Sequence, residues 1–285
     1  MGFVELVAVG IGFGLVALAV VVRALRYDID RDARSWASAY GVRLTDANSE
    51  FVRGYLRTGR RLRFVCSVAG FLLPPLVVHA VDPNSHPGPS FSGLIAGYMI
   101  GSLWAGLSPA RSTPGATRAA TLAPRRLEDY LPGRLRWGLW VIGGLTSAMA
   151  VAGTVVERPE YPSVTVSGSL MWIAGMAVAV AAAVETAQRW ILRRPQPFVA
   201  PDLVEADDAV RSSSIHALAG SGICCLLLLA IAPALVLADS RVQLLRWTMP
   251  WVALASLLGA GIAVRYYVYR AWRVRRPGPR VAVGG

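Results

Sequence analysis

The sequence contains no lysine, so all 29 of its basic residues are arginine. It also lacks the signatures of common enzyme classes: it has no G-x-x-x-x-G-K-S/T phosphate loop, no H-E-x-x-H zinc motif and no G-x-S-x-G nucleophile motif. Its three cysteines, Cys66, Cys224 and Cys225, all fall in or beside apolar segments. An odd number of cysteines in such segments argues against a disulfide framework. No motif therefore indicates an enzymatic activity, and the sequence favours a protein that is not an enzyme.

Charged residues are missing from the middle of seven long apolar stretches. A helix needs about 20 residues to cross ~30 Å of hydrocarbon, and a charge at its centre costs roughly 2.5–3.5 kcal/mol. The stretches cover residues 3–22, 64–81, 91–107, 138–156, 164–184, 218–238 and 249–264. They predict an all-α, polytopic integral membrane helical bundle of about seven transmembrane helices. Six is the alternative, because 91–107 and 249–264 are short.

Arginine is scarce in every second gap between these stretches. Ten, six, four and six arginines lie in 23–63, 108–136, 185–214 and 265–285, and three lie in the other gaps. Basic residues near span ends resist translocation, so the arginine-rich gaps are predicted to be cytoplasmic. The amino terminus is then outside and the basic tail 265–285 inside. The absence of lysine, with abundant alanine, valine and glycine, is typical of a bacterial protein from a GC-rich genome, which implies the plasma (cell) membrane.

The formal net charge is +12, which in a soluble protein would suggest nucleic acid. Here the arginines flank apolar stretches, so anionic lipids are the expected partner and nucleic acid is not. In the tail, tyrosine and tryptophan alternate with arginines that we expect to face lipid: Arg270, Arg273, Arg275 and Arg276.

Three arginine-rich gaps contain patterns typical of a helix start. Leu122-Ala123-Pro124 and Val199-Ala200-Pro201 each place proline at the first helical position. The amide N–H of that position has no acceptor within the helix, so proline loses no hydrogen bond there. Leu44-Thr45-Asp46 is a weaker copy, with Thr45 as the expected N-cap. The gaps 23–63, 108–136 and 185–214 are predicted to hold short amphipathic helices at the inner membrane surface. Three repeated units of helix plus hairpin are one interpretation; the ordinary needs of any loop before a span are the other.

The first of these helices, about Asp46 to Leu62, groups Phe51, Val52 and Tyr55 on one face. This pattern is typical of an interfacial helix whose apolar side lies in the headgroups. The alternative is a coupling helix that transmits force from a cytoplasmic partner such as an ATPase.

A metal site is one hypothesis for the second gap. His79, Asp82 and His86 offer imidazole and carboxylate ligands suited to zinc or a similar ion. Their spacing matches no strong zinc signature, so a polar, proline-stiffened turn is the alternative, and no cofactor is the default expectation.

Two features inside the stretches concern helix geometry. Pro74 and Pro75 remove two amide donors in mid-span, which predicts a kink or, alternatively, a broken helix that lines a transport path. Small residues that recur at four-residue spacing predict close helix packing or a seam between two copies of the chain: Gly93, Gly97, Gly101 and Gly259.

The acidic residues Glu205, Asp207 and Asp208 begin the third cytoplasmic helix. There they complement the helix dipole or form a docking surface for a basic partner. His216, at the start of the next span, is interpreted as an interfacial side chain.

Three classes of function remain. The first is a non-enzymatic membrane component, a scaffold or partner of a cytoplasmic protein. The second is a permease subunit powered by a separate ATPase. The third is a metal-binding enzyme or sensor at the external face.

Overall fold

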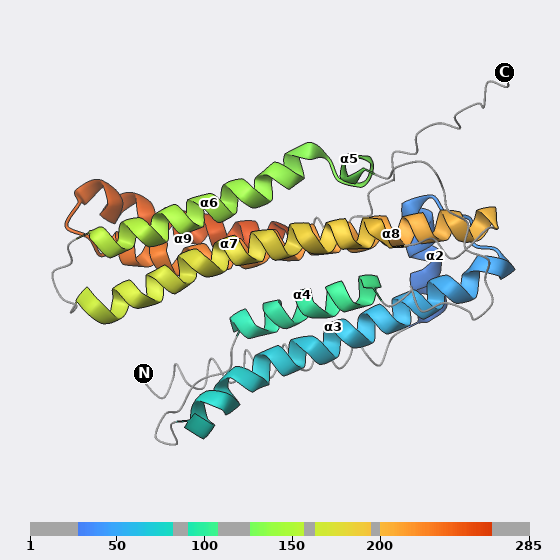
Figure 1. The fold of residues 1–285 in the computed structure, drawn as a ribbon, viewed down its shortest axis with the longest axis horizontal. Helices are drawn as coiled ribbons and strands as arrows, with labels where there is room; N and C mark the ends of the chain where they lie inside the picture. The colour runs from blue at the N-terminus through green and yellow to red at the C-terminus, as the bar shows by residue number, and fades with distance from the viewer. Residues whose placement is uncertain (1–27, 82–90, 108–125, 157–162, 195–199, 264–285) are drawn as a thin grey trace.

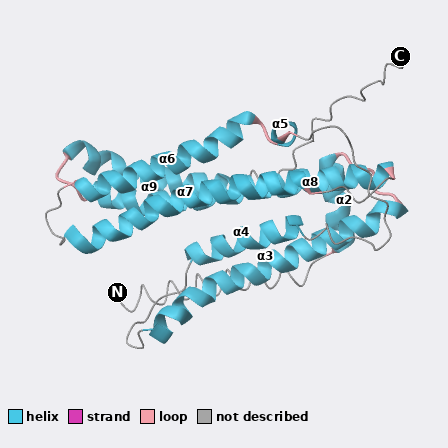
Figure 2. Ribbon diagram, in the orientation of Figure 1, coloured by secondary structure: helices cyan, strands magenta, loops and turns pink. Residues whose placement is uncertain are grey.

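The computed structural model describes residues 28–81, 91–107, 126–156, 163–194 and 200–263. Within these ranges all regular secondary structure is α-helical (Figure 2). The helices are α2 (Ile29–Tyr40), α3 (Asp46–Val81), α4 (Phe91–Leu107), α5 (Leu127–Tyr130), α6 (Gly133–Val155), α7 (Ser163–Arg193), α8 (Pro201–Ala238) and α9 (Gln243–Ala263). The predicted all-α fold is confirmed for this part of the chain.

The helices form two adjacent groups (Figure 1). Helices α3 and α4 pack against each other as one hairpin, and α6, α7, α8 and α9 form the other group. Helix α8 is central, because it packs against α3, α4, α6, α7 and α9. Its buried surface runs from Ala206 through Leu237. The ends of α4 and α7 and the beginnings of α3 and α8 meet at one end of the bundle, which we call the charged end.

Three described helical segments are long and apolar enough to cross a membrane: Leu135–Val155, Gly168–Arg193 and Pro201–Ala238. The structure thus supports three of the seven predicted spans. The predicted span 3–22 lies outside the described residues, and α4 has 17 residues. On α7, Trp172 is 77% exposed and Trp190 is 60% exposed. At 1.5 Å per residue they are about 27 Å apart along the axis, close to the thickness of the hydrocarbon core.

Helices α3 and α8 are each continuous, which corrects the prediction of separate short helices at the membrane surface. They have 36 and 38 residues, or about 54 and 57 Å, well beyond a ~30 Å hydrocarbon core. Pro201 is the first residue of α8, as predicted. Helix α5 is a separate short helix, but it begins at Leu127, and Pro124 lies outside the described residues.

Helix α2 packs across the beginnings of α3 and α8. Asp28 caps its amino end by accepting hydrogen bonds from the amides of Asp30 and Arg31. Gly41, at φ 69°, ends it in the left-handed conformation that favours glycine. Its apolar face joins a small core from α3 and α8: Ala33, Ala37, Tyr40, Val42, Val52, Ala206 and Ala209.

The amphipathic start of α3 is therefore not a headgroup anchor. Val52 is fully buried and Tyr55 is 5% exposed, both against protein. The helix begins at Asp46, as expected, but the Thr45 hydroxyl makes no hydrogen bond. Instead, the Asn48 side chain accepts from the Thr45 amide at 2.9 Å.

Candidate functional site

Two arginines and one aspartate form a buried triad at the charged end. Asp207 on α8 accepts from Arg194, which follows α7, and from Arg211 one turn further along α8 at 2.8 Å. Asp207 is 1% exposed, Arg211 is fully buried and Arg194 is 6% exposed. Burying charges is costly unless each one is paired and hydrogen-bonded, so the remaining donors of the triad need acceptors.

Helix ends supply those acceptors. Arg211 donates to the carbonyl oxygens of Ile191 at 2.9 Å and Arg194 at 2.8 Å, which belong to the carboxyl end of α7. Arg194 donates to the carbonyl of Gly106 at 2.9 Å, at the carboxyl end of α4. Each helix end carries roughly half a negative charge. The triad has a net charge of +1, which balances the partial negative charges of the two helix ends. Its hydrogen bonds also fix α4, α7 and α8 in register.

A second ionic cluster joins α6 to α7. Glu185 accepts from Arg136 at 3.0 Å, from Arg189 at 2.6 Å and from the indole nitrogen of Trp140 at 2.6 Å. Glu185 is 7% exposed. This carboxylate lies one residue beyond the predicted span 164–184.

Polar contacts also attach α2 and α3 to α8. The Trp36 indole donates to the Ser213 hydroxyl at 3.4 Å, and the hydroxyls of Tyr55 and Ser214 are 3.2 Å apart. Burial raises the pKa of Tyr40 to about 12, so this core tyrosine is neutral at physiological pH. The outer unit of α2 and the two helix beginnings is thus joined firmly to the membrane bundle.

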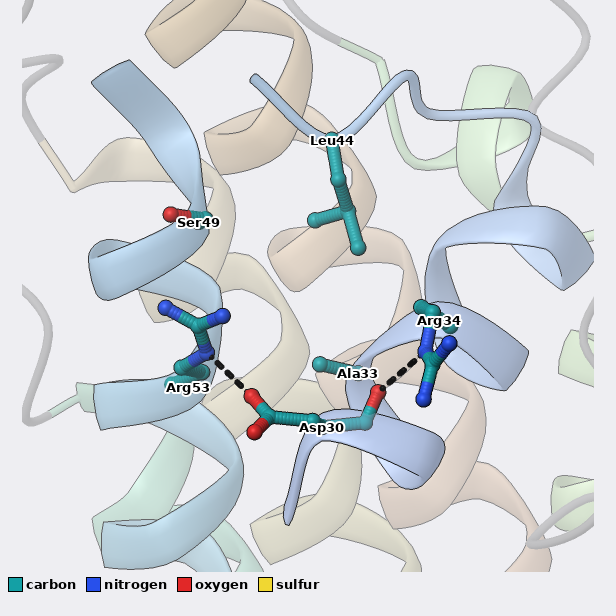
Figure 3. Close-up of a pocket in the computed structure, with 6 residues that line it drawn as sticks. All are labelled: Asp30, Ala33, Arg34, Leu44, Ser49 and Arg53. Carbon is teal, nitrogen blue, oxygen red and sulfur yellow. Dashed lines mark hydrogen bonds and ion pairs between the residues drawn. The ribbon is translucent and has the colours of Figure 1, made fainter. Parts of the chain in front are cut away.

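A cavity of about 370 Å³ opens on the surface of this unit (Figure 3). Asp30 lies between its two arginines: the Arg53 Nε atom is 2.7 Å from the Asp30 carboxylate, and the Arg34 Nε atom donates to the Asp30 carbonyl at 3.2 Å. The lining residues are Asp30, Ala33, Arg34, Leu44, Ser49 and Arg53. With two guanidinium groups and one carboxylate, the cavity has a positive balance that favours an anionic group.

Of the three predicted metal ligands, only His79 lies within the described residues. His79 lies exposed in the last turn of α3, while Asp82 and His86 lie outside the described ranges. Across those ranges, no three histidine, cysteine, aspartate or glutamate side chains are grouped as a metal site. Zinc at this loop stays a prediction.

Pro74 and Pro75 lie inside α3, which continues through both to Val81. They do not break the helix, so a path built from a broken helix has no support here.

The glycines of α4 lie against α3 at very short range. A Cβ atom added at Gly97 would lie 2.0 Å from the Cys66 carbonyl oxygen, and one at Gly101 would lie 2.6 Å from that of Leu62. Gly93 is equally close to Gly70 across the same interface. Gly259 on α9 packs more loosely, with 3.2 Å between its added Cβ and the Leu227 side chain. The four tail arginines, Arg270, Arg273, Arg275 and Arg276, lie outside the described residues.

Sequence reasoning missed the roles of Asp207 and His216. Asp207 was interpreted as a dipole-complementing or docking residue, whereas it is the centre of the triad. His216 is 1% exposed inside the bundle, not at an interface, and its Nδ1 atom is 2.8 Å from the Ser212 carbonyl. The four-residue spacing of Asp207 and Arg211 was a signal for the ion pair within α8. No sequence signal indicated that Arg194 joins it.

Comparisons of the chain with protein-family models, with curated proteins and with solved structures found no match. The three apolar helical segments are compatible with a membrane protein.

Proposed function

We propose that this chain is a non-enzymatic, multi-pass component of the plasma membrane that holds a cytoplasmic protein at its charged end. The proposal includes seven spans, an external amino terminus and a cytoplasmic carboxyl terminus. One observation carries it: α3 and α8 run without interruption from the apolar bundle into the small unit that α2 completes.

The described arginine-rich segments support the orientation, because they meet at the charged end. Arg53 on α3, Arg136 on α6 and Arg194 after α7 all belong to this end, whereas Arg241 and Arg246 belong to the opposite one. Positive residues favour the cytoplasmic side.

The cavity formed by α2 and α3 is the proposed point of attachment. It lies beyond the lipid: Arg53 precedes the apolar half of α3 by eleven residues, or about 16 Å along the axis. A ligand must reach it from the aqueous side. Its positive balance and its apolar walls, Ala33 and Leu44, fit an acidic segment of a protein.

The test is site-specific photocrosslinking in intact cells. A photoreactive amino acid at Ser49, which lines the cavity, should crosslink to one cytoplasmic protein, and the Arg53→Gln variant should weaken this crosslink. Glu50 provides the matched control, because it is exposed on the same turn of α3 and does not line the cavity.

Crosslinks from Ser49 to lipid alone, or equal crosslinks from Glu50, would contradict a docking site. Crosslinks to a second copy of this chain would identify the surface as a homo-oligomer interface and overturn the proposal of a cytoplasmic protein partner.

A further inference from the structure

Arg63 carries a charge for which the described structure offers no carboxylate partner. It is the last charged residue of α3 before the apolar segment 64–81, so it lies at the edge of the hydrocarbon. The residue is partly exposed, but its Nε atom is buried and makes no hydrogen bond. A guanidinium group in this setting has lost water without gaining a full set of acceptors.

The surroundings of Arg63 are polar but neutral. The Tyr98 ring of α4 lies 5.8 Å from the guanidinium carbon, a cation–π distance. Tyr55, about two turns earlier on α3, also lies near Arg63. These groups can orient a guanidinium, yet they do not neutralise it.

Close helix packing holds this position in place. A Cβ atom added at Gly101 would lie 2.7 Å from the Arg63 Cα atom, so α4 lies directly against the backbone of Arg63. The guanidinium therefore has a built site, unlike the exposed neighbours Arg57 and Arg61 on the same helix.

The described carboxylates that form ion pairs, Asp30, Glu185 and Asp207, pair with other arginines. Among the described residues, the ion pairs involve Arg53, Arg136, Arg189, Arg194 and Arg211, and none involves Arg63. Four acids lie outside the described ranges, Glu5, Asp82, Glu157 and Glu160. The sequence predicts all four on the opposite side of the membrane. The missing anion must then come from another molecule.

We propose that Arg63 binds the phosphate group of an anionic lipid of the inner leaflet, with the Tyr98 ring beside the guanidinium. The planar guanidinium suits bidentate hydrogen bonding to a phosphate. The depth at the hydrocarbon edge is the depth of lipid phosphates, and the partial exposure of Arg63 gives a headgroup access. The choice of leaflet rests on the proposed orientation, but this site is separate from the docking cavity, which lies about 15 Å further along α3, so lipid binding and protein docking can fail independently.

Native mass spectrometry of the full chain in mild detergent tests the proposal, with phosphatidylglycerol as the probe. The wild-type chain should retain one phosphatidylglycerol more tightly than phosphatidylcholine, whose choline cation offsets the phosphate. Arg63→Gln should weaken this binding by about tenfold to a hundredfold, as expected for loss of a charge-assisted contact. Arg61→Gln removes the same charge from an exposed neighbour and should leave this tight site unchanged.

Arg63→Lys keeps the charge and loses the bidentate fork, so it should bind several-fold more weakly. This variant decides the question alone if Arg63→Gln fails to fold. Equal retention of both lipids by the wild type, or equal losses in the Arg61 and Arg63 variants, would overturn the site. If millimolar inorganic phosphate displaced the lipid, the proposal that a lipid supplies the phosphate group at Arg63 would be overturned.

Discussion

At the scale of single residues, the first prediction concerns the stability that the buried triad of Asp207, Arg194 and Arg211 gives to the bundle. Asp207→Ala leaves Arg194 and Arg211 buried beside each other without a counter-charge. Removing one member of a buried ion pair costs about 3–5 kcal/mol, and we expect a loss of that size in the free energy of unfolding, measured by denaturant titration in detergent. Asp202→Ala is the matched control, because Asp202 is exposed in the first turn of the same helix. Its loss should stay below ~1 kcal/mol. Equal losses in the two variants would show that the triad does not stabilise the bundle.

A second residue-scale prediction concerns the cap of α2. Hydrogen bonds from the Arg31 and Asp30 amides hold the pKa of Asp28 below its ordinary value. The carboxylate cap is then fully present above the ordinary aspartate pKa of about 3.9. It is lost as the pH falls through the lowered pKa of the folded state. The protection of α2 amides against hydrogen exchange, relative to their intrinsic rates at each pH, should fall over that acidic range, and Asp28→Asn should remove this pH dependence because its amide oxygen does not titrate. The same pH dependence in the variant would exclude Asp28 as its cause.

At the scale of helices, the α3–α4 interface leaves no room for a side chain at Gly97. Gly97→Ala places a methyl group 2.0 Å from the Cys66 carbonyl oxygen, so the helices must separate. We expect the free energy of unfolding to fall by about 1–3 kcal/mol or more, although alanine has a better helix propensity than glycine. Gly175→Ala on α7 is the control, since nothing lies within 4 Å of its added Cβ. That variant should be neutral or slightly more stable, and a similar loss in both would remove the packing argument.

The same scale shows what the sequence could predict. The apolar stretches correctly located the apolar parts of α6, α7 and α8, because the requirement for about 20 uncharged residues is a local one. The stretches did not reveal that α3 and α8 continue well beyond their apolar parts. Between Arg63 and Phe64, and again around His216, no glycine or proline ends the helix. The change in hydropathy marks where the apolar surface of a helix begins, whereas the backbone has no reason to stop there.

The candidate site was less predictable for a similar physical reason. The triad joins Gly106, Arg194 and Asp207, which are 13 to 101 residues apart in sequence. Charge composition cannot show which arginines face water and which face helix ends. The metal hypothesis arose from three neighbouring residues, whereas the polar interior depends on contacts between distant helices.

For the whole molecule, the orientation is the property on which every proposed partner depends. The described residues provide two exposed positions at opposite ends: Ser38 on α2 at the charged end, and Val242 between α8 and α9. In a background in which Cys66, Cys224 and Cys225 are replaced by alanine, we introduce Ser38→Cys or Val242→Cys. If the charged end is cytoplasmic, a membrane-impermeant maleimide added to intact cells should label the cysteine at 242 and not the one at 38. Permeabilised cells are the control, because both positions should then react. Labelling at 38 alone in intact cells would reverse the orientation: the α2–α3 cavity would face the outside, and Arg63 would lie at the outer leaflet.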